Sequence, residues 1–128
     1  MVTRDAGRRS SEEVGRAVSA VFAGAGRPAR RAEAMARQLT RAEAMGRATH
    51  GLRLVEPYVG HLADGRMRAV GEPEVVVDTG ATSVLDSDRL PGLWLAEQVV
   101  TDGMRRADDF GVSVTAVRRS HPIGCLGG

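Results

Sequence analysis

Apolar residues recur at the three- and four-residue spacing of amphipathic helices in four stretches of the chain. The first stretch follows a capping-box pattern at Ser10–Glu13, and the second follows Pro28, whose missing N–H suits the first turn of a helix. The third contains Pro57, which is expected to bend it because proline removes a helical hydrogen bond. The apolar positions predict helices around Val14–Phe22, Ala32–Ala42, Leu54–Leu62 and Leu93–Ala107.

Three short runs rich in β-branched residues predict strands at 74–78, 82–86 and 112–117. The turn residues Thr79-Gly80-Ala81 between the first two runs favour antiparallel pairing. The third run directly follows the last helix, an order that is typical of α/β packing. We therefore expect an α/β fold with α+β character, in which N-terminal helices are followed by short strands and a long helix.

The length of 128 residues suits one domain with a modest core. The chain is 42% hydrophobic and 27% charged, which is typical of a globular protein rather than a disordered tail. We expect residues 1–9 to form a loose N-terminus and residues 10–128 to form the folded region. No apolar run approaches the ~18 residues of a membrane-spanning helix, and no apolar segment follows the charged first residues. We therefore expect a cytoplasmic protein without a membrane partner.

The charge pattern argues against a nucleic-acid partner. All 18 basic residues are arginine, but acidic residues are interspersed among them and the formal net charge is only +2. A nucleic-acid footprint would gather the positive charge on one face. Single-stranded nucleic acids are also bound by stacked aromatic side chains, and this chain has only Phe22, Tyr58, Trp94 and Phe110.

The strongest candidate for chemistry is the segment Thr49-His50-Gly51, which lies where a helical pattern breaks. Histidine titrates near neutral pH, and a following glycine lets a ligand approach the backbone closely. A second histidine, His121, lies in a glycine-rich segment after the last strand, whereas His61 is expected on a helix surface. Taken alone, a histidine such as His50 is more often a hydrogen-bonded structural residue than a catalyst.

No metal site or phosphate-binding loop is expected. Cys125 is the only cysteine, and the chain has no His-x-x-x-His or Cys-x-x-Cys spacing. Asp86 and Asp88 lie two residues apart, but the further ligands of a calcium loop are missing. No Walker loop is present, and no Gly-x-Gly-x-x-Gly follows a strand.

An ordered set of short motifs resembles the N-terminal part of the malate/L-lactate dehydrogenase family, from about Ala32 to Gly127. This family comprises NAD(P)-dependent 2-hydroxyacid oxidoreductases, including ureidoglycolate dehydrogenases and diketogulonate reductases, and is unrelated to the Rossmann-type enzymes. The motifs are Ala42-Glu43, Gly46, Thr49-His50-Gly51, Tyr58-Val59, Gly65, Glu72-Pro73-Glu74-Val75, Gly80-Ala81-Thr82, Asp86, Asp88, Gly92, Gly111-Val112 and Val117-Arg118.

The resemblance implies roles for individual residues. It implies that His50 and His121 are catalytic, and that Thr49 and Arg53 bind a small 2-hydroxy or 2-oxo acid. It assigns NAD or NADP to Ser120, His121 and Gly124. No metal ligand is implied.

Two positions depart from the family pattern. Family members commonly place the substrate arginine four residues after the histidine, where this chain has Leu54, and Arg53 lies one place earlier. When the family's Asn-His-Phe-Gly motif is aligned on Gly124, its histidine corresponds to Pro122, whereas His121 takes the asparagine position.

The resemblance leaves three hypotheses. In the first, the chain is an N-terminal fragment or split piece of an oxidoreductase, inactive alone because the dinucleotide-binding domain is missing, and it acts as a homo-oligomer such as a dimer or with a complementary chain. In the second, it is a non-catalytic remnant with a structural or partner-binding role. The third is a small arginine-rich nucleic-acid binder.

Overall fold

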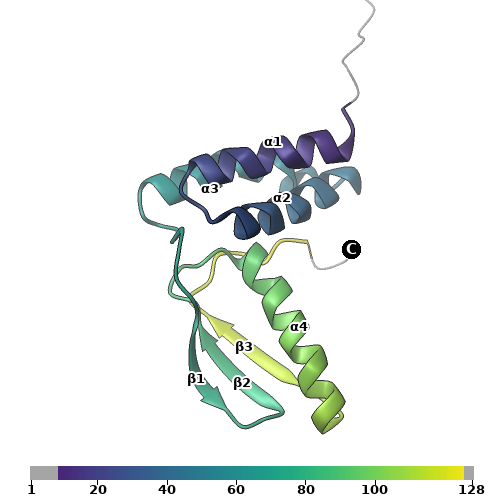
Figure 1. Ribbon diagram of the computed structural model, residues 1–128, viewed down its shortest axis with the longest axis vertical. Coiled ribbons are helices and arrows are strands. Elements are labelled where there is room, and N and C mark those ends of the chain that lie inside the picture. Colours follow the sequence, from purple (N-terminus) through teal and green to yellow (C-terminus); the bar gives the residue numbers. More distant parts are fainter. Residues whose placement is uncertain (1–8, 126–128) are drawn as a thin grey trace, which may run out of the picture.

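The computed structural model describes residues 9–125, so the expectation for residues 1–8 lies outside the described part of the chain. Three helices lie side by side in one layer, and a three-stranded sheet with a long helix extends from it (Figure 1). The elements are α1 (Ser11–Gly24), α2 (Ala29–Ala44), the 3₁₀ turns η1 (Ala48–His50) and η2 (Leu52–Leu54), α3 (Val55–Ala63), β1 (Glu74–Asp78), β2 (Thr82–Asp86), α4 (Gly92–Phe110) and β3 (Val114–Arg118).

The four predicted helices are confirmed, with a local difference before α3. The capping box is present, since the Glu13 amide donates to the Ser10 hydroxyl and the Ser10 amide donates to the Glu13 carboxylate. Residues 48–54 form two 3₁₀ turns, and α3 begins at Val55. Pro57 therefore lies in the first turn, where N–H groups have no helical partner and a proline costs nothing. The expectation that Pro57 removes a hydrogen bond from inside the helix is wrong for this reason.

The sheet has the order β1-β2-β3 and joins both pairing modes. β1 and β2 are antiparallel, from Glu74 opposite Asp86 to Asp78 opposite Ser83, with an irregularity between Val75 and Val77. β2 and β3 are parallel, and α4 is the crossover between them. The predicted α/β packing is thus confirmed for this part of the chain.

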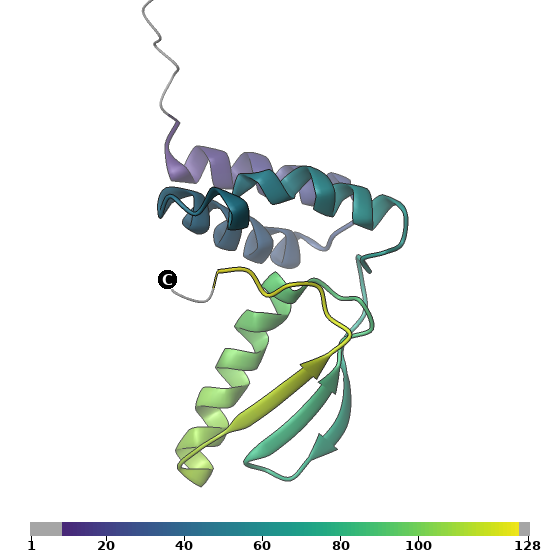
Figure 2. The same cartoon turned by 180° about the vertical axis from the view of Figure 1, so that it is seen from behind.

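The core joins the helical layer to the first turns of α4. Figures 1 and 2 show α4 beginning next to the helical layer and then running along the sheet. Phe22, Met35 and Leu39 are fully buried in the layer, as are Leu93 and Leu95 at the start of α4. The side chains of both parts form one apolar cluster.

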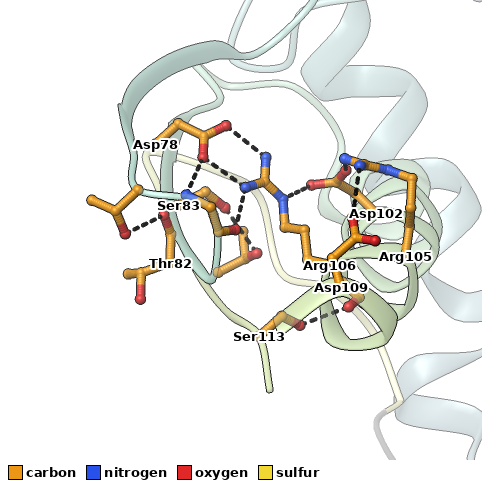
Figure 3. Close-up of polar contacts among 12 residues, drawn as sticks. Asp78, Thr82, Ser83, Asp102, Arg105, Arg106, Asp109 and Ser113 are labelled. Atoms are coloured by element: carbon orange, nitrogen blue, oxygen red, sulfur yellow. Dashed lines mark hydrogen bonds and ion pairs between the residues drawn. The ribbon is translucent and has the colours of Figure 1, made fainter. Parts of the chain in front are cut away.

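A buried arginine ties α4 to the far end of the sheet (Figure 3). Two guanidinium nitrogens of Arg106 bind the two carboxylate oxygens of Asp78, each at 2.7 Å, and one of them also donates to the Gly80 carbonyl at 2.7 Å. The same guanidinium pairs with Asp102 one turn earlier on α4. Hydrogen bonds from Arg106 hold the pKa of Asp78 well below its usual range. The network fixes the β1–β2 turn against the last turns of α4.

Candidate active site

The turn that carries His50 is shaped by the end of α2. α2 ends at Ala44, and Gly46 adopts a left-handed φ of 75° that turns the chain into η1. Gly51, between the two 3₁₀ turns, is buried against Glu43. A side chain at position 51 would collide with the Glu43 carboxylate and approach the Glu43 amide nitrogen to 3.0 Å. Packing against α2 therefore favours glycine at the position after His50.

Glu43 also orders the residues that follow. Its carboxylate accepts a hydrogen bond of 3.0 Å from the amide of Leu52, the first residue of η2. An anionic acceptor at the start of a helical turn satisfies one of its unpaired N–H groups. From the sequence, Glu43 was only one member of a motif. Its role could not be predicted locally, because the amide that it binds lies nine residues later in the chain.

The side chains of Thr49, His50 and Arg53 are exposed on this turn. The Thr49 hydroxyl lies 3.1 Å from Nδ1 of His50, within hydrogen-bond distance. Within residues 9–125, Nε2 of His50 has no hydrogen-bond partner and the Arg53 guanidinium forms neither a hydrogen bond nor an ion pair. The imidazole and the guanidinium are therefore both open to a ligand.

His121 lies in the extended segment after β3, and its ring contacts three other residues. Its Nε2 lies 2.7 Å from the carbonyl oxygen of Arg66, and its ring centroid is 5.4 Å from that of His61 and 6.5 Å from that of Tyr58. A carbonyl oxygen can only accept, so Nε2 of His121 donates and carries the proton. In the neutral ring, Nδ1 is then the atom that can accept a proton.

His61 was expected on a helix surface, and this expectation is wrong. The residue is half-buried, and its Nδ1 is shielded from solvent without a hydrogen-bond partner within residues 9–125. The cause is tertiary, since the segment of His121 packs against the end of α3. The helical spacing of Leu54 to Leu62 contains no sign of this contact, which joins residues 60 positions apart.

Two glycines allow the segment 120–125 to lie close to α4. A side chain at Gly92, the first residue of α4, would collide with the carbonyl oxygens of His121 and Pro122. Gly124 has a left-handed φ of 88°, and a side chain there would collide with Leu93. Figure 2 shows this segment passing from β3 over the first turn of α4 and beneath the helical layer.

Ion pairs hold the loop between β2 and α4 against the start of this segment. Asp86, whose side chain is only 4% exposed, accepts hydrogen bonds of 2.8 Å from both Arg118 and Arg119. The hydrogen bond from Arg119 is the main cause of the lowered pKa of Asp86. Asp88 pairs with Arg119 at 3.3 Å and with Arg68 at 2.9 Å. Asp86 at the end of β2 and Asp88 in the loop are therefore both paired with arginines.

Among the described residues, a hydrogen bond joins the two predicted segments. The guanidinium of Arg47 donates to the Cys125 sulfur at 2.9 Å, which joins the turn of His50 to the segment of His121. Within residues 9–125, no hydrogen bond, ion pair or ring contact links His50 to His121 themselves. Ser120 is half-buried, and its hydroxyl forms no hydrogen bond with another described residue.

The described part of the chain offers neither a metal centre nor a membrane span. In residues 9–125, no three side chains of His, Cys, Asp or Glu gather closely enough to hold a metal ion. Among the same residues, every helix is too short or too polar to cross a bilayer.

Comparison with known proteins identifies the family. The malate/L-lactate dehydrogenase family matches residues 10–128. Hydroxycarboxylate dehydrogenase B of Escherichia coli (strain K12) is 29% identical over 110 residues, which cover 86% of this chain and 30% of that protein. L-lactate dehydrogenase of Cupriavidus necator is 28% identical over 100 residues, which cover 78% of this chain and 29% of that protein.

Solved structures share the fold. Malate dehydrogenase of Pyrococcus horikoshii OT3 superposes with a TM-score of 0.90 at 21% identity, covering 94% of this chain and 34% of that chain. Sulfolactate dehydrogenase of Methanocaldococcus jannaschii superposes with a TM-score of 0.88 at 24% identity, covering 92% of this chain and 34% of that chain. The chain thus spans about a third of the length of the relatives that it matches. With nearly its whole length matched, the chain belongs to the malate/L-lactate dehydrogenase family.

Proposed function

We propose that this chain supplies part of the active site of an NAD(P)-dependent 2-hydroxyacid dehydrogenase and that turnover needs the part of the family's fold that these 128 residues do not span. The observation that carries the proposal is the family match over residues 10–128. The relatives are named for hydroxycarboxylate, L-lactate, malate and sulfolactate. L-lactate, malate and sulfolactate are 2-hydroxy acids, so we assign a small 2-hydroxy or 2-oxo acid as the substrate.

The imidazole of His50 is assigned to the hydroxyl proton. Oxidation of a 2-hydroxy acid removes a hydride from carbon and a proton from the hydroxyl group, and a protein base takes the proton. The exposed His50 ring with its unpartnered Nε2 suits this role. His121 is the second candidate, because its Nδ1 is the accepting atom of the neutral ring. The hydride acceptor is bound NAD(P), which supplies the redox chemistry.

Arg53 and Thr49 are assigned to the substrate. A guanidinium binds a carboxylate through paired, charge-assisted hydrogen bonds. Arg53 is exposed and has no anionic partner within residues 9–125. Arg53 therefore takes the role that the family's arginine has one residue later, and the Thr49 hydroxyl beside His50 is a second donor.

Ser120, His121 and Gly124 are assigned to the cofactor. The Ser120 hydroxyl has no partner among the described residues, so it is free to bind a polar group of a ligand. Gly124 does not offer a phosphate-binding site, because Leu93 fills the space beside its Cα. We assign it to a contact with another part of the cofactor. We assign these residues to one end of the dinucleotide, and the part of the fold outside these 128 residues to the rest of it.

The test is complementation. The 128-residue chain is mixed with the separately produced part of E. coli hydroxycarboxylate dehydrogenase B that it does not match, and NAD(P)H absorbance is followed with 2-oxo acids. We expect no turnover by either piece alone, turnover by the mixture, and its loss with His50→Gln. Arg53→Gln should raise KM, whereas Arg30→Gln, an exposed arginine far from this turn in sequence, should not.

The outcomes separate the hypotheses. Turnover by the isolated 128 residues would contradict the need for the rest of the fold. Retained turnover in His50→Gln would remove His50 from the mechanism. Binding of the two pieces without turnover would favour the non-catalytic, partner-binding role.

A further inference from the structure

An apolar groove of about 740 Å³ runs along α1 and α2, away from the residues assigned to the active site. Most of its lining side chains are small. They form two rows at four-residue spacing, one on each helix: Gly15, Ser19 and Ala23 on α1, and Ala36, Thr40 and Ala44 on α2. Charged side chains of the same two helices stand at its rim.

The shape of the groove fits a helix. Rows of side chains at four-residue spacing are the ridges and grooves along which helices pack, and small residues let a neighbouring helix approach closely. α1 has 14 residues and is about 21 Å long, enough for three to four turns of an occupant. A second copy of the same concave surface would leave a void, whereas a helix with larger apolar side chains would fill it.

The buried hydroxyl group of Thr40 is independent evidence that the groove binds a partner. Its side chain is in the lining, the residue is only 9% exposed, and its hydroxyl oxygen has no hydrogen-bond partner within residues 9–125. Buried hydroxyl groups in folded proteins are normally paired. A polar group from an occupant would supply the partner that the described residues do not.

Charges at the rim restrict the occupant further. Glu33 and Arg41 stand eight residues apart on α2, and neither side chain forms a hydrogen bond or ion pair within residues 9–125. An occupant helix with a basic side chain near Glu33 and an acidic one near Arg41, about 12 Å apart, would pair both.

We propose that this groove seats a helix from the part of the dehydrogenase fold that these 128 residues do not span. The proposal rests on the proposed function. The same α1–α2 arrangement occurs within the Pyrococcus horikoshii enzyme, of which this chain covers 34%, so about two thirds of that chain is available to cover it. The occupant carries a row of large apolar side chains flanked by the two charges described above.

The test measures binding between the 128-residue chain and the part of E. coli hydroxycarboxylate dehydrogenase B that it does not match. Ala20→Trp fills the groove from an exposed position on α1, and Ala17→Trp makes the same change at an exposed position outside it. We expect Ala20→Trp to raise Kd at least about tenfold, equivalent to about 1.4 kcal/mol. Ala17→Trp should leave Kd within about twofold, and circular dichroism checks the fold of both variants.

A charge reversal tests the same binding without enlarging a side chain in the groove. Arg41→Glu should weaken binding several-fold, whereas Arg30→Glu, an exposed arginine of the same helix outside the groove, should not. Thr40→Val should weaken binding by about threefold to tenfold if the occupant bonds to the hydroxyl.

The proposal is overturned if the groove variants bind as tightly as the wild-type chain or no more weakly than their controls. It is also overturned if the E. coli part binds its own matching segment but not this chain. Self-association that Ala20→Trp abolishes would assign the groove to a second copy instead. Groove-dependent binding without turnover would leave this proposal standing and contradict only the proposed catalytic function.

Discussion

The carboxylate of Glu43 occupies the space that a side chain at position 51 would need. This contact joins the last turn of α2 to the backbone directly after His50. Together with the hydrogen bond from the Leu52 amide to the same carboxylate, it sets the path of the turn that presents the imidazole. The Thr-His-Gly motif is therefore completed by a residue six positions before it.

Replacement of Gly51 by alanine should destabilise the fold. The added methyl group forces either the Glu43 side chain or the backbone of the turn to move, and overpacking of this kind costs about 1–3 kcal/mol. Urea unfolding followed by circular dichroism measures the effect. The matched control is Gly60→Ala, since Gly60 has open space around its Cα within α3, where alanine is favoured by up to ~1 kcal/mol. Equal stability of the two variants would contradict the packing role of Gly51.

The neutral ring of His121 should carry its proton on Nε2. The geometry requires this because the Arg66 carbonyl oxygen, 2.7 Å away, accepts and cannot donate. Two-bond ¹⁵N–¹H NMR spectra of the full chain above neutral pH distinguish the two tautomers directly. A predominant Nδ1–H form would show that the hydrogen bond to Arg66 does not persist in solution. It would also contradict the assignment of Nδ1 as the atom that accepts a proton.

Gly92→Ala should displace the segment that carries His121. The methyl group would meet the backbone oxygens of His121 and Pro122, which cannot swing away as a flexible side chain does. We expect a loss of about 1–3 kcal/mol and altered NMR shifts of the His121 ring. Gly24→Ala, where nothing lies within 4 Å of the added atom, is the control. An unchanged His121 spectrum in Gly92→Ala would contradict the close packing of this segment on α4.

Asp78→Asn should make stability less dependent on acid pH. Hydrogen bonds from Arg106 lower the pKa of Asp78 in the folded state below the value of about 3.9 expected in the unfolded state. The unfolded state therefore binds the proton more readily, so the contribution of Asp78 is complete above about pH 5 and is lost as pH falls through 4 toward the folded-state pKa.

Urea midpoints measured between pH 7 and pH 2.5 test this. The wild-type midpoint should fall more steeply with pH than that of Asp78→Asn. Asp108→Asn removes an exposed carboxylate of α4 that forms no hydrogen bond or ion pair within residues 9–125, and its profile should follow the wild type. Parallel profiles for Asp78→Asn and the wild type would show that the pair with Arg106 does not contribute.

Local patterns in the sequence were enough to predict the elements. Helical spacing, the capping box at Ser10–Glu13 and the β-branched runs act over a few residues, so the four helices, three strands and the β1–β2 hairpin could be predicted. The resemblance to the family rested on the order of short motifs around His50, and the match over residues 10–128 confirms it. The assignment of individual site residues stays a prediction.

What the sequence determined by itself was therefore the succession of helices and strands and the family. Tertiary structure decided which distant residues meet: Arg106 with Asp78, Arg47 with Cys125, and His121 with Arg66 and His61. These contacts join positions 28 to 78 residues apart. Periodicity and capping are short-range effects, whereas these contacts depend on how α4, the sheet and the helical layer pack, so no local pattern encodes them.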